Sequence, residues 1–335
     1  MRRQILGQTG IEISRLGFGC VRLPSERREA IRILEHAFSL GITHFDVARI
    51  YGFGQAEAHL GEFLRGKRQQ VTVATKFGIQ PPTGMAGNPR LIELAKKILG
   101  PFPGLIRRAR RRRTQMVQAG VFTPQAAVES LELSLRTLGT DSIDIFFLHE
   151  ATLSDAANEP LIEALRQQVR RGKIRSFGIA SLFDNLKGGA GVPAAYQVLQ
   201  FNDNAVEPNL ADLPNRERHG LLTHSIFQPF PFLLEAIAAE QALAGKYSAE
   251  MNVDLTDAGV IGSLLLHYAL RANPDGVILF ASMSPERISS NVRDAESSPY
   301  SDQQLSSFVK FGKAFLKSAS GAKLKSLPKN PWKRK

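Results

Sequence analysis

Apolar residues along this chain fall into two alternating patterns, short continuous runs and longer segments with helical spacing. The short runs are rich in Val, Ile, Leu and Phe and have the length of buried strands, whereas the longer segments repeat apolar residues every three or four positions. The candidate core strands are Arg15–Cys20, Ile42–Asp46, Val71–Thr75, Ile143–Leu148, Ile174–Ala180, Val198–Phe201, Leu221–Ser225 and Val277–Phe280. The candidate helices between them are Arg27–Leu40, Gln55–Arg65, Pro124–Leu138, Pro160–Arg171, Leu233–Leu243 and Asp257–Arg271. This alternation predicts a parallel sheet covered by helices.

Local start and stop signals support several of these helices. Thr123 is a suitable cap for the helix that begins at Pro124, and Gly139 and Gly172 follow the ends of two helices. Ahead of the first core strand, the residues that flank Gly7 to Gly10 predict an N-terminal β-hairpin. Eight strand–helix units that close on themselves form a (β/α)8 TIM barrel, while a doubly wound open sheet is also compatible with the pattern.

Two segments interrupt the alternation. Residues 80–121 form a long insertion after the third strand, with proline and glycine turns around a possible short helix at Arg90–Leu99. Long irregular segments in compact domains commonly act as lids, so we expect this insertion to border the mouth of the barrel. The stretch 318–335 is basic and proline-punctuated and is predicted to be a tail, which leaves 1–317 as a single barrel domain.

The composition is that of an enzyme-sized globular protein without a membrane span. With 335 residues and 43% hydrophobic content, the chain can bury a core of this kind. The basic N-terminus lacks the apolar stretch of a signal peptide, and the single cysteine, Cys20, excludes an internal disulfide and a cysteine-based metal cluster. We therefore expect a cytoplasmic protein that does not insert into membranes.

The formal net charge of +12 is concentrated in two places. One is the arginine block between Arg107 and Arg113, and the other is the stretch after Asp302, which has many lysines and no acidic residue. Basic patches attract polyanions, but no zinc finger, recognition helix or aromatic-interleaved RNA motif accompanies them. The charge is therefore interpreted as solvated surface without a specific nucleic-acid partner, and nothing in the pattern specifies an oligomeric state.

Four polar residues of chemically useful types stand at or just beyond strand ends. Asp46 ends the second core strand and Tyr51 follows it, while Lys76 and His149 follow the third and fourth strands. Because the loops after the strands of a parallel barrel meet at one face, we expect these side chains to lie close together. Each residue taken singly could be an ordinary rim residue, but the joint pattern predicts an acid–base site.

The segments that carry these residues resemble the aldo-keto reductase superfamily. The likeness runs from about Arg3 to Asp294 and is carried by LGQTGIEISRLGFGC, DVARIYGFGQAEAHLGEFL and ASMSPERISSN. It implies a (β/α)8 barrel that reduces carbonyl compounds, or oxidises alcohols, with a nicotinamide dinucleotide and without a metal. The insertion and the tail lie outside the likeness.

The four residue types suit that chemistry. Hydride delivery to a carbonyl leaves negative charge on its oxygen, which needs a proton and electrostatic stabilisation. Tyr51 is the predicted proton donor, and a cation from Lys76 would favour its phenolate form, because free tyrosine titrates near pH ~10. Asp46 would pair with Lys76 and hold it in place, and His149 would orient the carbonyl or assist proton transfer.

The cofactor-binding residues are implied by the same resemblance. A glycine motif of the Rossmann type is incomplete, because Glu57 stands where the third glycine after Gly52 would be. The resemblance points instead to Gly19, Cys20, Asp46, Ser181, Gln200, His224, Ser225, Ser282, Arg287 and Asn291. Arg287 has a guanidinium suited to a 2′-phosphate, which favours NADP(H) over NAD(H).

Three positions depart from the family pattern. Ala281 stands where many relatives have a phosphate-binding lysine, Leu182 replaces an asparagine that contacts the carboxamide, and His224 replaces the aromatic residue that stacks on nicotinamide. An imidazole ring is planar but offers less stacking area than tyrosine. We therefore expect the cofactor to bind more loosely or in an altered pose.

Two other functions are compatible with parts of the sequence. A redox-sensing or regulatory barrel protein with little turnover would keep the fold and the cofactor, and the altered cofactor contacts leave room for it. A metal-dependent hydrolase is disfavoured, because the seven histidines form no H-x-H pair or evident ligand set. The expected partner is a small carbonyl compound or alcohol, selected by the insertion, the loop after His149 and the region Phe227–Phe232.

Overall fold

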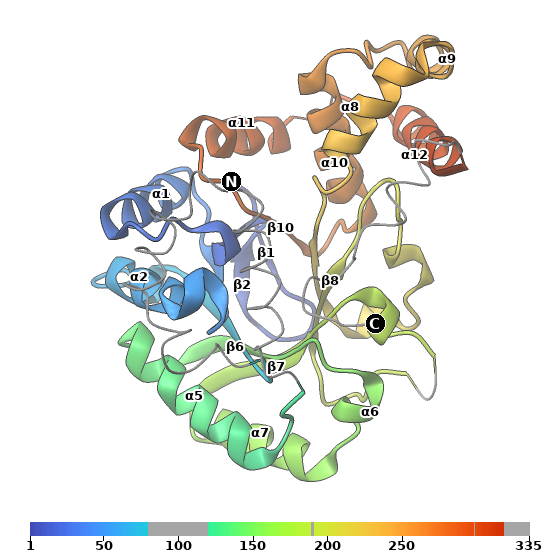
Figure 1. The fold of residues 1–335 in the computed structure, drawn as a ribbon. Helices are drawn as coiled ribbons and strands as arrows, with labels where there is room; N and C mark the ends of the chain where they lie inside the picture. Colours follow the sequence, from blue (N-terminus) through green and yellow to red (C-terminus); the bar gives the residue numbers. More distant parts are fainter. Residues whose placement is uncertain (80–119, 189–190, 298, 318–335) are drawn as a thin grey trace, which may run out of the picture.

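The computed structural model describes residues 1–79, 120–188, 191–297 and 299–317, and its centre is a closed barrel of eight parallel strands (Figure 1). In barrel order the strands are β10 (Val277–Phe280), β3 (Leu16–Gly19), β4 (His44–Asp46), β5 (Thr72–Phe77), β6 (Ile143–His149), β7 (Ile174–Ala180), β8 (Val198–Asn202) and β9 (Gly220–His224). The predicted (β/α)8 barrel is confirmed, and the open doubly wound sheet is excluded.

Helices surround the barrel and cover the outer face of its strands (Figure 1). They are α1 (Arg27–Ser39), α2 (Ala56–Phe63), α5 (Pro124–Leu138), α6 (Leu153–Ala156), α7 (Glu159–Arg170), α8 (Phe230–Ala239), α9 (Gln241–Met251), α10 (Ala258–Ala272), α11 (Pro285–Ala295) and α12 (Asp302–Lys317). Apolar helix faces and outward-facing strand residues share one buried cluster. For example, Phe45 of β4 and Phe63 of α2 have ring centroids 4.9 Å apart. Burial of this apolar surface is the main force that holds the helices on the barrel.

Helix α5 begins and ends where its local signals predict. The Thr123 side chain accepts a hydrogen bond from the Ala126 amide, and Gly139 closes the helix in the left-handed conformation at φ 62°. Gly172, which follows α7, has φ 72°. Such angles favour glycine because it has no Cβ atom to clash with the backbone.

Two helical regions differ from the expectation. The segment Leu233–Leu243, expected as one helix, is divided between α8 and α9, because Glu240 leaves the helical region at φ −124° and ψ 55°. Helix α12 was not expected, although its buried Phe308, Phe311 and Phe315 recur at helical spacing. The expected helix at Arg90–Leu99, most of the insertion and the predicted tail lie outside the described residues.

The expected N-terminal hairpin pairs β1 (Arg3–Ile5) with β2 (Glu12–Ser14) and closes the amino-terminal end of the barrel. Leu6, Ile11 and Ile13 are buried in one cluster with residues from the barrel interior. At Gly7, φ is 51° and a Cβ atom would lie 2.5 Å from the amide nitrogen of Gly220 at the start of β9. The hairpin thus closes this end with apolar side chains and leaves the carboxyl-terminal end of the strands for a site.

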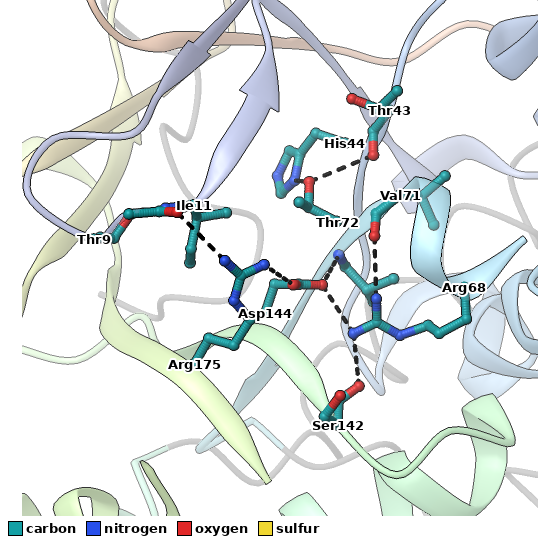
Figure 2. A network of polar contacts seen from close by, with 12 residues as sticks. Thr9, Ile11, Thr43, His44, Arg68, Val71, Thr72, Ser142, Asp144 and Arg175 are labelled. Atoms are coloured by element: carbon teal, nitrogen blue, oxygen red, sulfur yellow. Dashed lines mark hydrogen bonds and ion pairs between the residues drawn. The ribbon is translucent and has the colours of Figure 1, made fainter. Parts of the chain in front are cut away.

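A buried carboxylate fastens the same end of the barrel (Figure 2). Asp144 of β6 accepts a hydrogen bond from the Val73 amide at 2.8 Å. It also forms ion pairs with Arg68 and Arg175, each at 2.9 Å. Arg175 in turn donates to the carbonyl of Gly10 in the hairpin turn at 3.4 Å. One carboxylate therefore links β5, the turn before it and the strand that contacts the hairpin.

Asp144→Asn should destabilise the fold by about 3 kcal/mol, because it leaves the largely buried guanidinium of Arg68 without its counter-charge. Arg175→Ala removes a partner whose side chain is 48% exposed and should cost less than about 1 kcal/mol. Urea unfolding of both variants measures the two free energies. Small and equal losses would show that Asp144 is not the group that fastens this end.

Candidate active site

A buried ion pair occupies the carboxyl-terminal end of the barrel. Lys76 of β5 places its Nζ 2.6 Å from both carboxylate oxygens of Asp46, and the same Nζ donates to the Val47 carbonyl at 3.1 Å. The two strands are neighbours, and Asp46 lies opposite Ala74, two residues before the lysine. The structure therefore places Asp46 and Lys76 in contact, as the sequence led us to expect.

Desolvation dominates the electrostatics of this pair. Burial raises the pKa of Asp46 and lowers the pKa of Lys76, and the charge of each partner opposes the shift of the other. From the far side of the barrel, Gln200 Nε2 of β8 donates to Asp46 Oδ2 at 3.1 Å. The pair is held as a hydrogen-bonded salt bridge with further polar contacts to Val47 and Gln200.

Tyr51 lies beside the pair. It begins the 3₁₀ turn Tyr51–Gly54 that follows β4. Its ring centroid is 5.3 Å from Lys76 Nζ and 6.0 Å from the centroid of the His149 ring, whose plane is inclined at 84° to it. The four residues Asp46, Tyr51, Lys76 and His149 thus converge from the ends of three consecutive strands, β4, β5 and β6.

The phenol of Tyr51 is held in its protonated form. Burial raises its pKa well above the usual range, and the charges of Asp46 and Glu150 act in the same direction. Lys76 lies 5.3 Å from the ring centroid, and the role predicted for it, to favour the phenolate as the proton leaves, stays a prediction.

His149, the last residue of β6, is 6% exposed. Burial lowers its pKa well below the usual range, and the charges of Lys76 and His224 lower it further. The imidazole is therefore neutral around neutral pH. A neutral ring has one nitrogen that donates and one that accepts, so it can contact a substrate oxygen as a donor.

Gln200 and Ser181 have polar side-chain atoms near the pair that can form hydrogen bonds with an amide group. The Ser181 amide donates to the Gln200 carbonyl at 2.9 Å, which ties the loop after β7 to β8. Gln200 Oε1 is buried and has no hydrogen-bond partner among the described residues. Because buried polar atoms are normally paired, this oxygen is suited to accept a hydrogen bond from the amide of a bound cofactor.

His224 ends β9, the strand next to β8, and Ser225 follows it. His224 Nδ1 lies 2.8 Å from the Ser225 hydroxyl, and Ser225 has φ 65°. Burial, followed by the charge of Lys76, lowers the pKa of His224 to about 4. The ring is therefore neutral and partly exposed, and it offers a planar face without a charge.

The other predicted cofactor-binding residues follow β10 and β3, which are paired with each other. Ser282 follows β10, and Arg287 and Asn291 lie on α11, where the Ser284 side chain caps the first turn. Gly19 ends β3, and Cys20 after it has a thiol whose pKa burial raises, so it stays protonated. Gly19 is the strand partner of Asp46, so this set adjoins the Tyr51 cluster at β4. With the others, these residues occupy the ends of six consecutive strands, from β7 around to β4.

Two residues at the site were not singled out from the sequence. Glu150 adopts φ 60°, a left-handed conformation that is uncommon for glutamate, and its carboxylate lies 3.5 Å from the Leu182 amide. Asn185 Nδ2 donates to the Ser181 hydroxyl at 2.7 Å. Asn185 could have been found from the sequence, because it is an asparagine only three residues after Leu182, the position where the family pattern has one. Glu150 had no such signal, because its conformation depends on how the strand ends pack.

The described residues contain neither a metal-binding cluster nor a membrane-spanning helix. No group of three or more His, Cys, Asp or Glu side chains within the described ranges is arranged to hold a metal ion. No helix within these ranges is both long and apolar enough to cross a bilayer. The hydrolase alternative therefore gains no support from this part of the chain.

Comparison with known proteins connects this arrangement to one family. The model described as "Aldo/keto reductase family" matches residues 15–210, more than half of the chain. The chain belongs to the aldo/keto reductase family. Among curated relatives of this aldo/keto reductase, the uncharacterized oxidoreductase YqkF of Bacillus subtilis is 30% identical over 188 residues, 56% of this chain and 51% of its own length. Aldo-keto reductase yakc of Schizosaccharomyces pombe, whose name specifies NADP(+), is 31% identical over 177 residues, 51% of this chain and 43% of its own length.

The chain spans about half the length of the curated aldo/keto reductases that it matches. Solved structures align over more of it. The holo form of aldo-keto reductase AKR11C1 from Bacillus halodurans has a TM-score of 0.69 and 21% identity, and the match covers 94% of this chain and 97% of that chain. The putative aldo-keto reductase PA4992 from Pseudomonas aeruginosa has a TM-score of 0.59 and 20% identity, with 88% and 93% covered. At these identities the likeness shows the fold.

Glu150→Gln should lower the pKa of the Tyr51 phenol, because Glu150 is one of the charges that raise it. A group that acts as an acid loses activity as the pH rises through its pKa, so for Tyr51 in its predicted role the alkaline limit of turnover should move to lower pH. Glu163→Gln, exposed on α7, is the matched control. Profiles of kcat against pH for the three proteins check this, and coincident alkaline limbs would contradict it.

Proposed function

We propose that this protein transfers hydride from NADPH to an aldehyde or ketone, or catalyses the reverse oxidation of an alcohol, without a metal. The observation that carries the proposal is the convergence of Tyr51, the Lys76–Asp46 pair and His149 at the strand ends. Membership of the aldo/keto reductase family supports the reaction class. The substrate is expected to be a small molecule that reaches the site from the carboxyl-terminal face of the barrel.

Tyr51 acts as the acid in this proposal. A carbonyl oxygen bound by the Tyr51 hydroxyl and the His149 ring receives the phenol proton as negative charge develops on it. Nicotinamide, when bound, supplies the hydride. Lys76, 5.3 Å from the Tyr51 ring centroid, then stabilises the phenolate, and Asp46 keeps the lysine in place. In the oxidation direction the alcohol hydroxyl gives its proton to the Tyr51 phenolate, and the oxidised nicotinamide would take up the hydride.

The residues present fit a nicotinamide dinucleotide. Gln200 Oε1 and the Ser181 hydroxyl would hold the carboxamide, and His224 would present its ring face. The start of α11, with the exposed Arg287, would hold phosphate. The forked guanidinium of Arg287 and the NADP(+) in the name of the S. pombe relative support NADP(H) over NAD(H).

A redox-sensing or regulatory role with little turnover is the second candidate. His224 favours this role, because its ring is smaller than the aromatic ring of the family pattern and offers less area for stacking on nicotinamide. Its Nδ1 is also in a hydrogen bond with the Ser225 hydroxyl. Steady-state NADPH oxidation over a panel of aldehydes and ketones, with a chelator control, separates the two functions. Tight NADPH binding without turnover on any member of the panel would favour the regulatory role.

Tyr51→Phe should lower turnover by about 10²–10⁴-fold, because it removes the acid and keeps the ring. The melting temperature and NADPH affinity should stay close to those of the wild type. Tyr247→Phe, on α9, is the control substitution and should leave kcat unchanged. Unchanged turnover of Tyr51→Phe on a good substrate would rule out the assignment.

Arg287→Ala should weaken NADPH binding by about 10–100-fold, equivalent to roughly 1–3 kcal/mol, with little change for NADH. The reason is that a charge-assisted contact to the 2′-phosphate is lost, and NADH has no such group. Arg293→Ala, at the other end of α11, is the matched control. Fluorescence titration with both cofactors measures the affinities, and equal weakening for both would assign Arg287 a structural role.

A further inference from the structure

A buried carboxylate outside the site, Glu57, joins the segments that carry Lys76 and Tyr51. Glu57 is only 3% exposed although it lies on α2. Its Oε1 accepts hydrogen bonds from the Thr75 hydroxyl of β5 and the Ser134 hydroxyl of α5, each at 2.7 Å. None of these three groups takes part in the proposed proton transfer, so the burial of this carboxylate needs another explanation.

Thr75 and Lys76 occupy opposite faces of β5. Adjacent residues of a strand point to opposite sides, so Thr75 faces the surrounding helices and Lys76 points into the barrel, where it contacts Asp46. Both side chains are almost completely buried. The hydrogen bond that holds Thr75 from outside therefore fixes the strand from which Lys76 projects.

Glu57 is also close to Tyr51 along a continuous segment. The 3₁₀ turn Tyr51–Gly54 ends at Gln55, which is also the residue that precedes α2. The Gln55 carbonyl accepts a hydrogen bond from the His59 amide at 3.0 Å, so the turn runs directly into the helix. A displacement of Glu57 is therefore transmitted to Tyr51 over a short, hydrogen-bonded stretch.

A carboxylate at this position is costly to bury. Burial raises the pKa of Glu57, while the two hydroxyls and Arg49 lower it. Arg49 donates to the Ser130 hydroxyl of α5 at 3.3 Å, which attaches the loop between Asp46 and Tyr51 to the same helix. An apolar side chain could fill this space without the desolvation cost. The buried carboxylate is therefore better explained by the positions that it fixes than by a contribution to stability.

We propose that Glu57 is a positioning residue that sets the separation between Lys76 and Tyr51. It holds β5 through Thr75, while its own helix continues from Tyr51, so one carboxylate keeps the ammonium 5.3 Å from the centroid of the phenol ring. This inference rests on the proposed function, because it connects that separation to turnover. Small misplacements of reacting groups lower turnover steeply.

Two substitutions of matched chemistry test the proposal. Thr75→Val and Ser134→Ala each remove one hydroxyl from the same oxygen of Glu57 and should lower the melting temperature by similar amounts. Only Thr75 lies on the strand of Lys76, so Thr75→Val should lower kcat about tenfold with KM and NADPH affinity nearly unchanged. Ser134→Ala should keep kcat within about twofold, and Thr75→Ser, which restores the hydroxyl, should recover it.

A measurement without turnover distinguishes this inference from the proposed function. The chain has five tyrosines, so ¹³C labelling of the tyrosine ζ carbon, with Tyr51→Phe for assignment, identifies the NMR signal of Tyr51. The signal should shift in Thr75→Val and stay in place in Ser134→Ala. A shift of this kind in a protein that reduces no carbonyl would support the positioning role while contradicting the reductase function.

Two results would overturn the positioning role. One is an unchanged Tyr51 signal and unchanged kcat in Thr75→Val. The other is an equal loss of kcat in Thr75→Val and Ser134→Ala, which would mean that both act through general destabilisation.

Discussion

Two opposite charges, those of Lys76 and Asp46, are buried against each other at the carboxyl-terminal end of the barrel. Removing such ions from water is expensive, and their attraction offsets the cost only when the geometry is close and the remaining polar atoms are satisfied. Here the ammonium contacts both carboxylate oxygens and the Val47 carbonyl, and Gln200 adds a hydrogen bond from the opposite side. The pair depends on the register of the strands, so the packing of the barrel and the chemistry of the site are coupled.

Burial explains the state of Tyr51. Desolvation keeps the phenol protonated, and the negative charge of Asp46 acts in the same direction. The protonated phenol and the neutral His149 lie next to each other, with ring centroids 6.0 Å apart, and each has a proton to donate. Such a site suits the stabilisation of negative charge on an oxygen, which is the requirement of carbonyl reduction.

The two ends of the barrel have different roles, since one is closed by stabilising contacts and the other carries the candidate active site. At the amino-terminal end, the hairpin and the Asp144 network close the barrel with apolar side chains and ion pairs (Figure 2). At the other end, polar side chains are grouped by strand. The candidate acid–base residues lie at or just after the ends of β4, β5 and β6, and the candidate cofactor residues lie along the arc from β7 around to β4. Asp46, on β4, belongs to both groups and joins them.

Much of this architecture could be predicted from the sequence because it depends on local signals. Strand runs, helical periodicity, the cap at Thr123 and the glycine at Gly139 are properties of a few neighbouring residues, and they located most elements within a few positions. The order of Asp46, Tyr51, Lys76 and His149 at strand ends was also visible, because parallel strands present their ends at one face. The break at Glu240 was not, since it depends on a single backbone conformation.

Interactions between distant parts of the chain were decided by the tertiary structure. Gln200 and Asp46 are 154 residues apart, and Ser134 and Glu57 are 77 apart, so no periodicity connects them. The sequence by itself determined which residue types reach the carboxyl-terminal face of the barrel. Only the folded structure decided the protonation of Tyr51, the conformation of Glu150 and the burial of Glu57. The physical reason is that desolvation and the interaction of charges depend on which groups are brought together in three dimensions.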